Sequence, residues 1–346
     1  MTHNPDEPLI ISASRTKDMV RCSPDVLADI LLGTSPCRWG PRGPFGQVDP
    51  GRVHSVVLWT KDPRNLLDHQ RLRDALMELH SRCNILISLQ VTVTGLGGSF
   101  LEPGIPHWHE VRSSLAELLC EGWINPAGVI YRYDPFLTVR TPAGKIFSNV
   151  DVEIFARLSA EFLSLGIQRV TTSRADAVRY PRVAERIRTL GLEWVHIDDK
   201  AAAELCRNMA DFCHSKGADF SVCCEPNVPG LRDNWGCIDG RWLNRIKGDA
   251  FPPATEIPHN RIGKQRPTCQ CTYSRDIGYS TGSATCYSGG FGCLYCYAQG
   301  NAQLPDIDRI LTEIRDFERH PVQYLAEKKL FEQLTKFDES NPCCSG

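Results

Sequence analysis

The sequence predicts an α/β fold, in the form of a partial or complete parallel (βα) barrel of about six or more units. Three observations predict it. Short apolar runs alternate with amphipathic stretches of about 10 to 20 residues through the first part of the chain. The total length of 346 residues suits a single α/β barrel with an appendage. No Gly-x-Gly-x-x-Gly follows the first apolar run, which makes an open, doubly wound sheet the less favoured alternative.

Each predicted strand is a short apolar run. The strands are expected at residues 9–14, 56–59, 85–94, 129–132, 169–172 and 220–223. The third strand alternates, with Ile87, Leu89 and Val91 on one side and Ser88 and Gln90 on the other, which is the period of a strand. Its polar face suits either solvent or a polar barrel lumen.

The predicted helices carry recognisable start and stop signals. In the first, Ser23 is the expected N-cap, Pro24 the first helical residue and Gly33 the stop. Ser148 with Asp151 gives another helix a start that resembles a capping box. The helices are expected at 23–33, 63–82, through 111–119, at 148–166, 181–190 and 198–216, and two polar amphipathic helices near 306–318 and 322–337 close the chain.

Composition limits the classes of function. Apolar residues make up 42% of the chain and charged residues 23%, as in ordinary globular proteins. A net charge of −2 excludes a strong overall attraction to nucleic acid or to an anionic membrane. No long apolar stretch and no signal-peptide pattern occur, so a cytoplasmic protein is expected. The expected divisions are a barrel-like domain at 1–240, a cysteine-rich cluster-binding region at 241–303, and helices with a tail at 304–346.

The chain has 16 cysteines, and they are unevenly distributed. Cytoplasmic thiols stay reduced, so a clustered subset points to metal or redox chemistry. Cys286, Cys293 and Cys296 form a Cys-x6-Cys-x2-Cys pattern, with Cys269 and Cys271 just upstream. The favoured interpretation is that thiols of this group of five bind an iron–sulfur cluster. Structural zinc is the alternative, although its usual form pairs two Cys-x2-Cys turns.

The remaining cysteines are interpreted differently. Those that lie singly, among them Cys22 and Cys213, are expected to be small buried apolar residues. Cys223, Cys224 and Cys237 lie near the sixth predicted strand, and either metal binding or simple burial of the thiol is open for each of them.

Ionisable side chains stand where several predicted strands end. In a parallel barrel the catalytic groups gather at that edge. Arg15, Lys61 and Arg132 are expected to hold carboxylate or phosphate groups. Asp134 and Glu225 are expected to bind ribose hydroxyls or to move protons. The alternative for each residue alone is that a strand end simply meets solvent.

Several motifs resemble those of one known family. The stretch Cys269-Gln-Cys-Thr-Tyr-Ser-Arg-Asp-Ile-Gly-Tyr279, then Thr285-Cys286, then Gly292-Cys-Leu-Tyr-Cys-Tyr-Ala298 looks like the C-terminal signature of the family called domain of unknown function 1848. Its earlier landmarks occur in the expected order, as Ile10-Ile-Ser-Ala-Ser-Arg15, Trp59-Thr-Lys-Asp-Pro63, Tyr131-Arg-Tyr-Asp-Pro135 and Gly236-Cys-Ile-Asp239. The resemblance implies no reaction, because the family has none assigned.

The terminal cysteines also resemble the Cys-x3-Cys-x2-Cys motif of radical S-adenosylmethionine enzymes, in which three thiolates hold a [4Fe-4S] cluster and the fourth iron binds S-adenosylmethionine. Tyr295 stands where those enzymes commonly have an aromatic residue. The resemblance implies cofactor contacts by Tyr295, Lys61 and Arg132, an electron donor such as a ferredoxin or flavodoxin, and a small-molecule or nucleotide-type substrate. Two departures are the spacing, three residues longer here, and the position of the motif after the last strand instead of the first.

Several alternatives stay open. If Cys269 or Cys271 completes a four-thiolate site, the cluster is closed, and the protein is then a non-redox metabolite- or nucleic-acid-binding protein with a closed iron–sulfur or zinc site. Otherwise these two cysteines flank the site or serve a second metal. Loop 34–52 carries Arg38, Arg42 and Arg52 among aromatic residues, a pattern that suits single-stranded nucleic acid but is more often a solvated loop. No membrane partner is expected.

Overall fold

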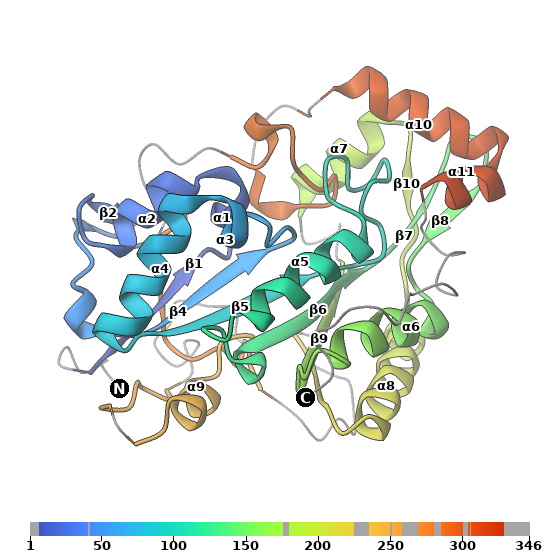
Figure 1. The fold of residues 1–346 in the computed structure, drawn as a ribbon. Coiled ribbons are helices and arrows are strands. Elements are labelled where there is room, and N and C mark those ends of the chain that lie inside the picture. Colours follow the sequence, from blue (N-terminus) through green and yellow to red (C-terminus); the bar gives the residue numbers. More distant parts are fainter. Residues whose placement is uncertain are drawn as a thin grey trace.

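A computed structural model of the protein describes residues 7–40, 42–175, 180–224, 235–249, 251–257, 269–279, 285–299, 304 and 306–328 (Figure 1). Its centre is a seven-stranded sheet in which every pairing is parallel. The strands of this sheet are β1 (Leu9–Ala13), β4 (Val53–Thr60), β5 (Leu86–Thr92), β6 (Val129–Phe136), β9 (Arg169–Arg174), β11 (Asp219–Val222) and β12 (Arg275–Asp276). The predicted parallel α/β fold is therefore confirmed.

The strands follow one another through the sheet as they do along the chain. The order is β11-β9-β6-β5-β4-β1-β12. Only β12 departs from the order of the chain, because it is the last strand and lies next to the first, β1. A doubly wound sheet instead reverses its strand order partway across. Within the described residues β11 and β12 are the two edges of the sheet. A complete, closed barrel is therefore not shown.

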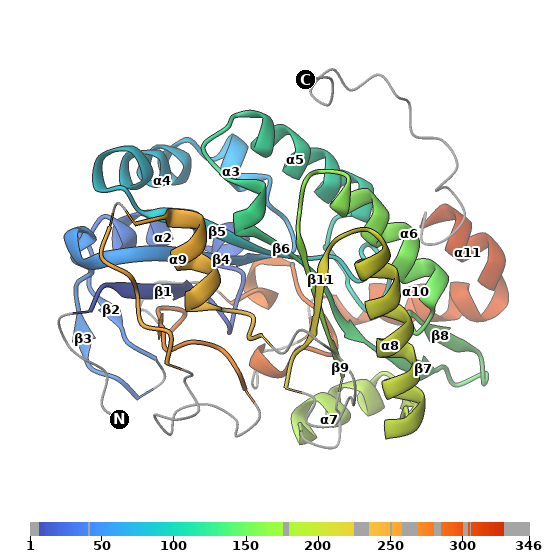
Figure 2. The same cartoon turned by 90° about the horizontal axis from the view of Figure 1, so that it is seen from below.

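Helices cover one face of this sheet. Figure 2 shows α4, α5, α6 and α8 side by side along that face. The main apolar core lies between these helices and the sheet, where the rings of Tyr131 and Phe162 stack at 4.6 Å. The helices are α1 (Met19–Cys22), α2 (Pro24–Leu31), α3 (Asn65–Asp68), α4 (Gln70–Cys83), α5 (Trp108–Cys120), α6 (Val152–Leu163), α7 (Pro181–Thr189), α8 (Asp199–Ser215), α9 (Gly240–Lys247), α10 (Ile307–Arg319) and α11 (Pro321–Glu327).

Capping residues in the sequence predicted most helix starts to within a few residues of their observed positions. Ser23 and Pro24 begin α2 as expected. The N-cap of α6 is Asp151, whose carboxylate accepts hydrogen bonds from two backbone N–H groups of the first turn. The predicted helix 63–82 is two helices, because His69 adopts an extended conformation and caps α4. Residues after 328 lie outside the described part of the chain, so the predicted extent of the last helix is untested.

The second face of the sheet is covered as well. Both faces of β5 are buried, including Ser88 and Gln90 at 2% and 1% exposure. The Gln90 amide donates to the Cys237 carbonyl at 2.6 Å, so the segment before α9 covers this face. The polar side of β5 therefore faces the protein interior and not solvent. The sequence predicted neither α9, which has eight residues, nor β12, which has two.

The C-terminal part of the chain packs against the segment that follows β5. The Leu294 N–H donates to the Leu101 carbonyl at 2.9 Å, and α10 and α11 pack on an apolar cluster with the antiparallel strands β7 (Thr138–Arg140), β8 (Ile146–Ser148) and β10 (Glu193–Trp194). A two-stranded ribbon of β2 (Cys37–Arg38) and β3 (Phe45–Gly46) completes the strands. None of the described helices combines the length and apolar character needed to cross a bilayer. The three-way division of the chain stays a prediction.

Candidate functional site

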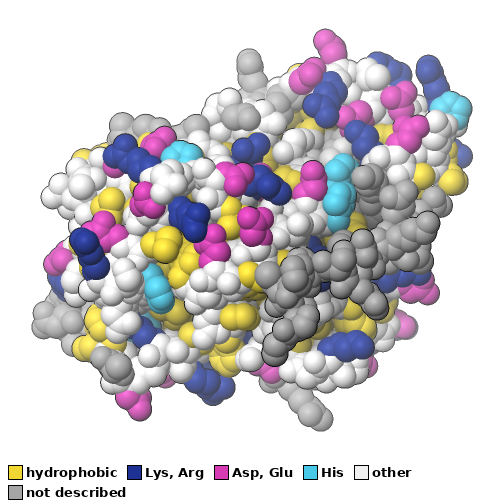
Figure 3. Space-filling model, in the orientation of Figure 1, with side chains coloured by type: hydrophobic (Ala, Val, Ile, Leu, Met, Phe, Trp, Pro, Cys, Tyr) yellow, Lys and Arg dark blue, Asp and Glu magenta, His cyan; other side chains and the backbone are white. Residues whose placement is uncertain are grey.

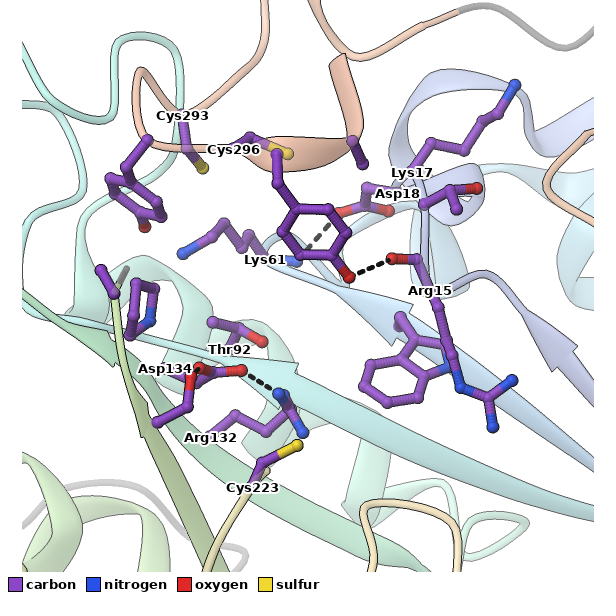
Figure 4. A pocket seen from close by; sticks show the side chains of 18 of the residues that line it. Arg15, Lys17, Asp18, Lys61, Thr92, Arg132, Asp134, Cys223, Cys293 and Cys296 are labelled. Atoms are coloured by element: carbon purple, nitrogen blue, oxygen red, sulfur yellow. Dashed lines mark hydrogen bonds and ion pairs between the residues drawn. The ribbon is translucent and has the colours of Figure 1, made fainter. Parts of the chain in front are cut away.

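A cavity of about 300 Å³ opens where the parallel strands end (Figure 4). Every described residue that the sequence nominated for the site lines this cavity. These residues are Arg15, Lys61, Arg132, Asp134, Tyr295, Cys269, Cys271, Cys286, Cys293 and Cys296. Glu225 lies outside the described residues. The structure thus brings the ten described residues to one place, while their chemical roles stay predictions.

Strand geometry explains how the wall of the cavity forms. Arg132 and Asp134 are two residues apart on β6, so both project from the same face of the sheet. The guanidinium of Arg132 lies over the ring of Trp59 on the nearby strand β4, at 4.8 Å from its centroid. This arrangement gives the cavity a floor of one cation and one indole.

Cys286, Cys293 and Cys296, here called the loop thiols, lie on one side of the cavity. They share a small apolar cluster with Ile105 and Phe291. The turn between them is closed by hydrogen bonds from the Phe291 N–H to the Cys286 carbonyl and from the Cys296 N–H to the Cys293 carbonyl, each 3.0 Å. The longer spacing between Cys286 and Cys293 is thus accommodated in an ordered turn.

Gly292 has a packing role in this turn. A Cβ at that position would stand 2.2 Å from the ring of Tyr287, whose hydroxyl donates to the Cys293 carbonyl at 2.8 Å. The glycine therefore lets the tyrosine ring lie flat against the turn. Arg186 of α7 holds the turn from outside by donating to the carbonyls of Leu294 and Cys296, at 2.9 Å each.

A fourth thiol, Cys22 at the end of α1, lies against Cys286. It belongs to the same apolar cluster as the loop thiols, but it is not among the residues that line the cavity. No sequence pattern connects Cys22 with the motif, because 263 residues separate it from Cys286 and only the fold places α1 beside that loop. The interpretation of Cys22 as an isolated buried thiol therefore misses its nearest partner.

The other cysteines of the cavity form a separate group, here called the sheet thiols: Cys223, Cys224, Cys237, Cys269 and Cys271. The Sγ atoms of Cys223 and Cys224 are 3.8 Å apart. The sheet thiols share a second apolar cluster with Ile10 and Val57, distinct from the cluster around the loop thiols. Cys269 and Cys271 thus lie with cysteines near β11 and α9 instead of with the loop thiols. In Figure 4, Cys223 and the pair Cys293 and Cys296 lie on opposite sides of the drawn residues.

Each cation that the sequence nominated is already paired with a carboxylate. Lys61 Nζ donates to Glu102 Oε1 at 2.9 Å. Arg132 forms an ion pair with Asp134. The backbone N–H of Arg15 donates to the Asp276 carboxylate at 2.8 Å, and its guanidinium stands 3.9 Å from the same group. An anionic ligand would therefore have to share these cations with the protein's own acids.

The thiols influence the same cations. Burial lowers the pKa of Lys61, but Glu102 and Cys293 raise it more, so the pKa ends above its usual value. Burial likewise opposes ionisation of Arg132, and the charges of Cys237 and Cys223 more than offset it, so its pKa is raised. Lys61 therefore interacts with the loop thiol Cys293, whereas Arg132 interacts with the sheet thiols Cys237 and Cys223.

Glu102 and Asp18 are acids of the site that were not predicted. The buried carboxylate of Glu102 accepts hydrogen bonds from Lys61, from Thr94 at 2.7 Å and from the Tyr295 hydroxyl. Asp18 accepts from the Lys61 N–H at 2.8 Å, and its own N–H points to Cys286 Sγ at 3.4 Å. Burial and the nearby Cys286 raise the pKa of Asp18 to about 7. Neither acid follows a strand directly, which is why the strand-end argument missed them.

The donor set fits a metal–sulfur group in its chemistry. Several thiols and a backbone N–H directed at a thiol sulfur match two features of iron–sulfur sites, which are thiolate ligands and hydrogen bonds to the sulfurs. Among the described residues, no three His, Cys, Asp or Glu side chains already converge at the spacing of metal ligands. Binding would therefore require rotation of the thiols about their Cα–Cβ bonds together with loss of their protons.

Two comparisons relate the chain to known proteins. Residues 10–298 match the protein family described as "Domain of unknown function (DUF1848)", a stretch that contains every cavity residue named above. A search of curated proteins finds no match to the chain.

Proposed function

The chain belongs to the DUF1848 family, whose description names no reaction, and from the geometry of the cavity we propose that it is an iron–sulfur enzyme. In this proposal it cleaves S-adenosylmethionine reductively and directs the resulting radical at a small-molecule or nucleotide-type substrate. The observation that carries the proposal is that the three loop thiols line the cavity together at the edge of a parallel sheet where active sites form.

The loop thiols are the proposed ligands of a [4Fe-4S] cluster. When bound there with one iron open, the cluster would coordinate S-adenosylmethionine and supply the electron that cleaves its sulfonium. Cys286 already receives the Asp18 N–H at 3.4 Å, and hydrogen bonds to cluster sulfurs raise the reduction potential. Because Cys22 does not line the cavity, three thiolates face the space that the substrate would occupy.

The remaining residues bind and orient. Tyr295 and Lys61 are held by the single carboxylate of Glu102, so their positions are coupled. Lys61 would share its ammonium protons between Glu102 and a ligand carboxylate. Arg132 and Asp134 present a neutral pair that suits hydroxyl groups of a ribose better than a free phosphate. Zinc in place of the cluster, and a role for Glu225, stay predictions.

A one-electron donor such as a ferredoxin or flavodoxin is required by the proposal. Nucleic acid is a weaker candidate as substrate. In loop 34–52 the guanidinium of Arg38 already lies over Phe45 at 4.8 Å, and Arg275 lies over Trp39 at 5.0 Å. Figure 3 shows basic and acidic side chains interspersed over the face of the molecule that it displays, without a large basic patch among the described residues.

The test is anaerobic purification followed by electron paramagnetic resonance of the reduced protein, with and without S-adenosylmethionine. We expect a cluster signal that shifts on addition of S-adenosylmethionine, and reductant-dependent cleavage measured by chromatography. Cys286→Ala, Cys293→Ala and Cys296→Ala should each abolish both. Cys213→Ala, a buried thiol of α8 in the main core, is the matched control and should retain them. A cluster without any cleavage would refute the proposal.

One observation favours a second candidate, a closed site in a non-redox binding protein. Cys22 lies against Cys286 and offers a fourth thiolate. Four thiolates would leave no open iron, or would close a tetrahedral zinc site. Cys22→Ala separates the candidates. It should leave the cluster and its response to S-adenosylmethionine intact in the enzyme, and should remove the metal from a closed site.

A further inference from the structure

The sheet thiols come together from three separate stretches of the chain. Cys223 and Cys224 follow β11, Cys237 precedes α9, and Cys269 and Cys271 precede β12. Each thiol interacts with its neighbours. Cys223 contacts Cys224 and Cys237, Cys237 contacts Cys271, Cys271 contacts Cys269, and Cys269 contacts Cys224. The five contacts close a ring of thiols, and Cys237, Cys269 and Cys271 are each at most 4% exposed.

The backbone is built to permit this convergence. At Gly236, a Cβ would stand 2.3 Å from the Cys271 nitrogen and 2.4 Å from its Cα, so only glycine lets the two segments meet. The Thr272 N–H then donates to the Ile238 carbonyl at 2.8 Å and joins the segments side by side. Cys224 has φ of 59°, a left-handed conformation that non-glycine residues seldom adopt and that tends to occur at functional sites.

The cations Arg15 and Arg132 lie beside the sheet thiols. Arg15 is close to Cys271 and Cys269, and Arg132 is close to Cys237 and Cys223. Both guanidinium groups also face the ring of Trp59. Arg132 and Arg15 favour ionisation of Cys237 and Cys271, but the neighbouring thiols and burial oppose it more strongly, so the pKa of each thiol stays above its usual value and a bound metal would have to displace the thiol proton.

We propose that the sheet thiols form a second thiolate-bound metal centre, of the iron–sulfur or the zinc type, separate from the one proposed for the loop thiols. Both types of centre require a soft metal that is held by four of the five thiolates. A mere packing role explains the ring poorly, because five thiols from three segments fill space no better than alanine or valine would. The two groups line one cavity, so the second centre faces the same substrate space.

The experiment begins with the triple variant Cys286→Ser, Cys293→Ser, Cys296→Ser, purified anaerobically as the full chain. In this protein any tightly bound metal belongs to the sheet thiols, which are unaltered. We expect a bound metal by elemental analysis, with sulfur as its ligand by X-ray absorption. Iron with inorganic sulfide identifies a cluster, and zinc without sulfide identifies a mononuclear site; both outcomes support the centre. A folded triple variant without bound metal overturns it.

A reciprocal variant keeps the inference testable if the triple variant does not fold. Cys237→Ser should remove the second complement of metal and leave the metal of the loop thiols, with Cys213→Ala as the burial-matched control. Unchanged metal content in folded Cys237→Ser and Cys271→Ser proteins would also overturn the inference. Loss of metal from Cys237→Ser is expected whether or not the loop thiols hold a cluster, and S-adenosylmethionine cleavage is not among the readouts.

Discussion

The loop thiols and the sheet thiols line the same cavity, but the chain assembles them in opposite ways. The loop thiols span residues 286–296, and hydrogen bonds within that turn hold them. The sheet thiols come from three segments, which meet through Gly236 and through a backbone hydrogen bond between Thr272 and Ile238. The first group thus depends on local geometry, and the second depends on the packing of distant parts of the chain. Changes that disturb one group selectively therefore test whether they are independent centres.

The largest expected effect is on the side of the loop thiols. Glu102→Gln leaves the Lys61 ammonium buried without its carboxylate, and breaking a buried ion pair in this way costs about 3–5 kcal/mol. We expect that loss in the free energy of unfolding, measured with denaturant, together with weaker S-adenosylmethionine cleavage. Metal at the sheet thiols should be unchanged.

The matched control for that variant is Glu78→Gln, which removes an exposed ion pair with Arg82 on α4. Exposed pairs contribute at most about 1 kcal/mol, so little change is expected. Equal destabilisation by the two variants would contradict the assigned importance of the Lys61–Glu102 pair.

Gly236→Ala should act on the other group. Its Cβ would meet backbone atoms, which cannot rotate away, so we expect about 3 kcal/mol of destabilisation, at the upper end for overpacking. The sheet thiols should lose metal by elemental analysis, whereas the loop thiols keep their response to S-adenosylmethionine. Gly51→Ala, at an exposed position where the nearest atom is 3.3 Å away, is the control. Loss of metal from both groups together would show that they are one unit.

Gly292→Ala is the counterpart on the loop. Its Cβ would meet the ring of Tyr287, a side chain that can move, so about 1 kcal/mol is expected. The geometry of the turn should change more than its stability. We expect a cluster signal of altered shape and slower cleavage, with the metal of the sheet thiols retained. An unaltered signal would mean that the turn tolerates movement of Tyr287 and that its packing does not position the thiols.

A pH-dependent effect concerns a support of the sheet thiols. Helix α9, which follows Cys237, is tied to β4 because Lys247 Nζ donates to the His54 carbonyl at 2.9 Å. Burial, and secondarily Lys247, lowers the pKa of His54 from 6.5 to about 3. Between these values the unfolded chain binds the proton and the folded protein does not, so stability falls as the pH drops below about 6.5. His54→Gln should flatten this dependence in thermal melts at pH 4.5 to 7; an unchanged slope would contradict it.

The sequence was most informative where information is local. Cys286, Cys293 and Cys296 were read from spacing alone, and helix starts at Pro24 and near Asp151 followed from capping residues. The strand-end argument placed Arg15, Lys61 and Arg132 on one cavity, because parallel strands share an edge. The motif resemblance was sufficient to predict the family that the match over residues 10–298 confirms.

Sequence patterns did not reveal partners that are distant along the chain. Cys22 was interpreted as a buried apolar residue, yet it lies against Cys286. For Cys269 and Cys271 the sequence left open a place in the cluster of the loop thiols or a separate role, and in the structure their neighbours are the other sheet thiols. Glu102 was missed because no pattern in the nearby sequence predicts that Lys61 and Tyr295 share its carboxylate.

By itself the sequence determined six strands of the parallel sheet, most of the helices that cover it and the family, since periodicity and motif spacing are properties of short stretches. Only the tertiary structure decided how the cysteines are divided between two sides of a cavity and which acid neutralises each cation. The physical reason is that thiol contacts and ion pairs act over a few ångströms in space, whatever the separation in sequence. Their partners are chosen by the order of the strands and by close backbone approach at glycines such as Gly236.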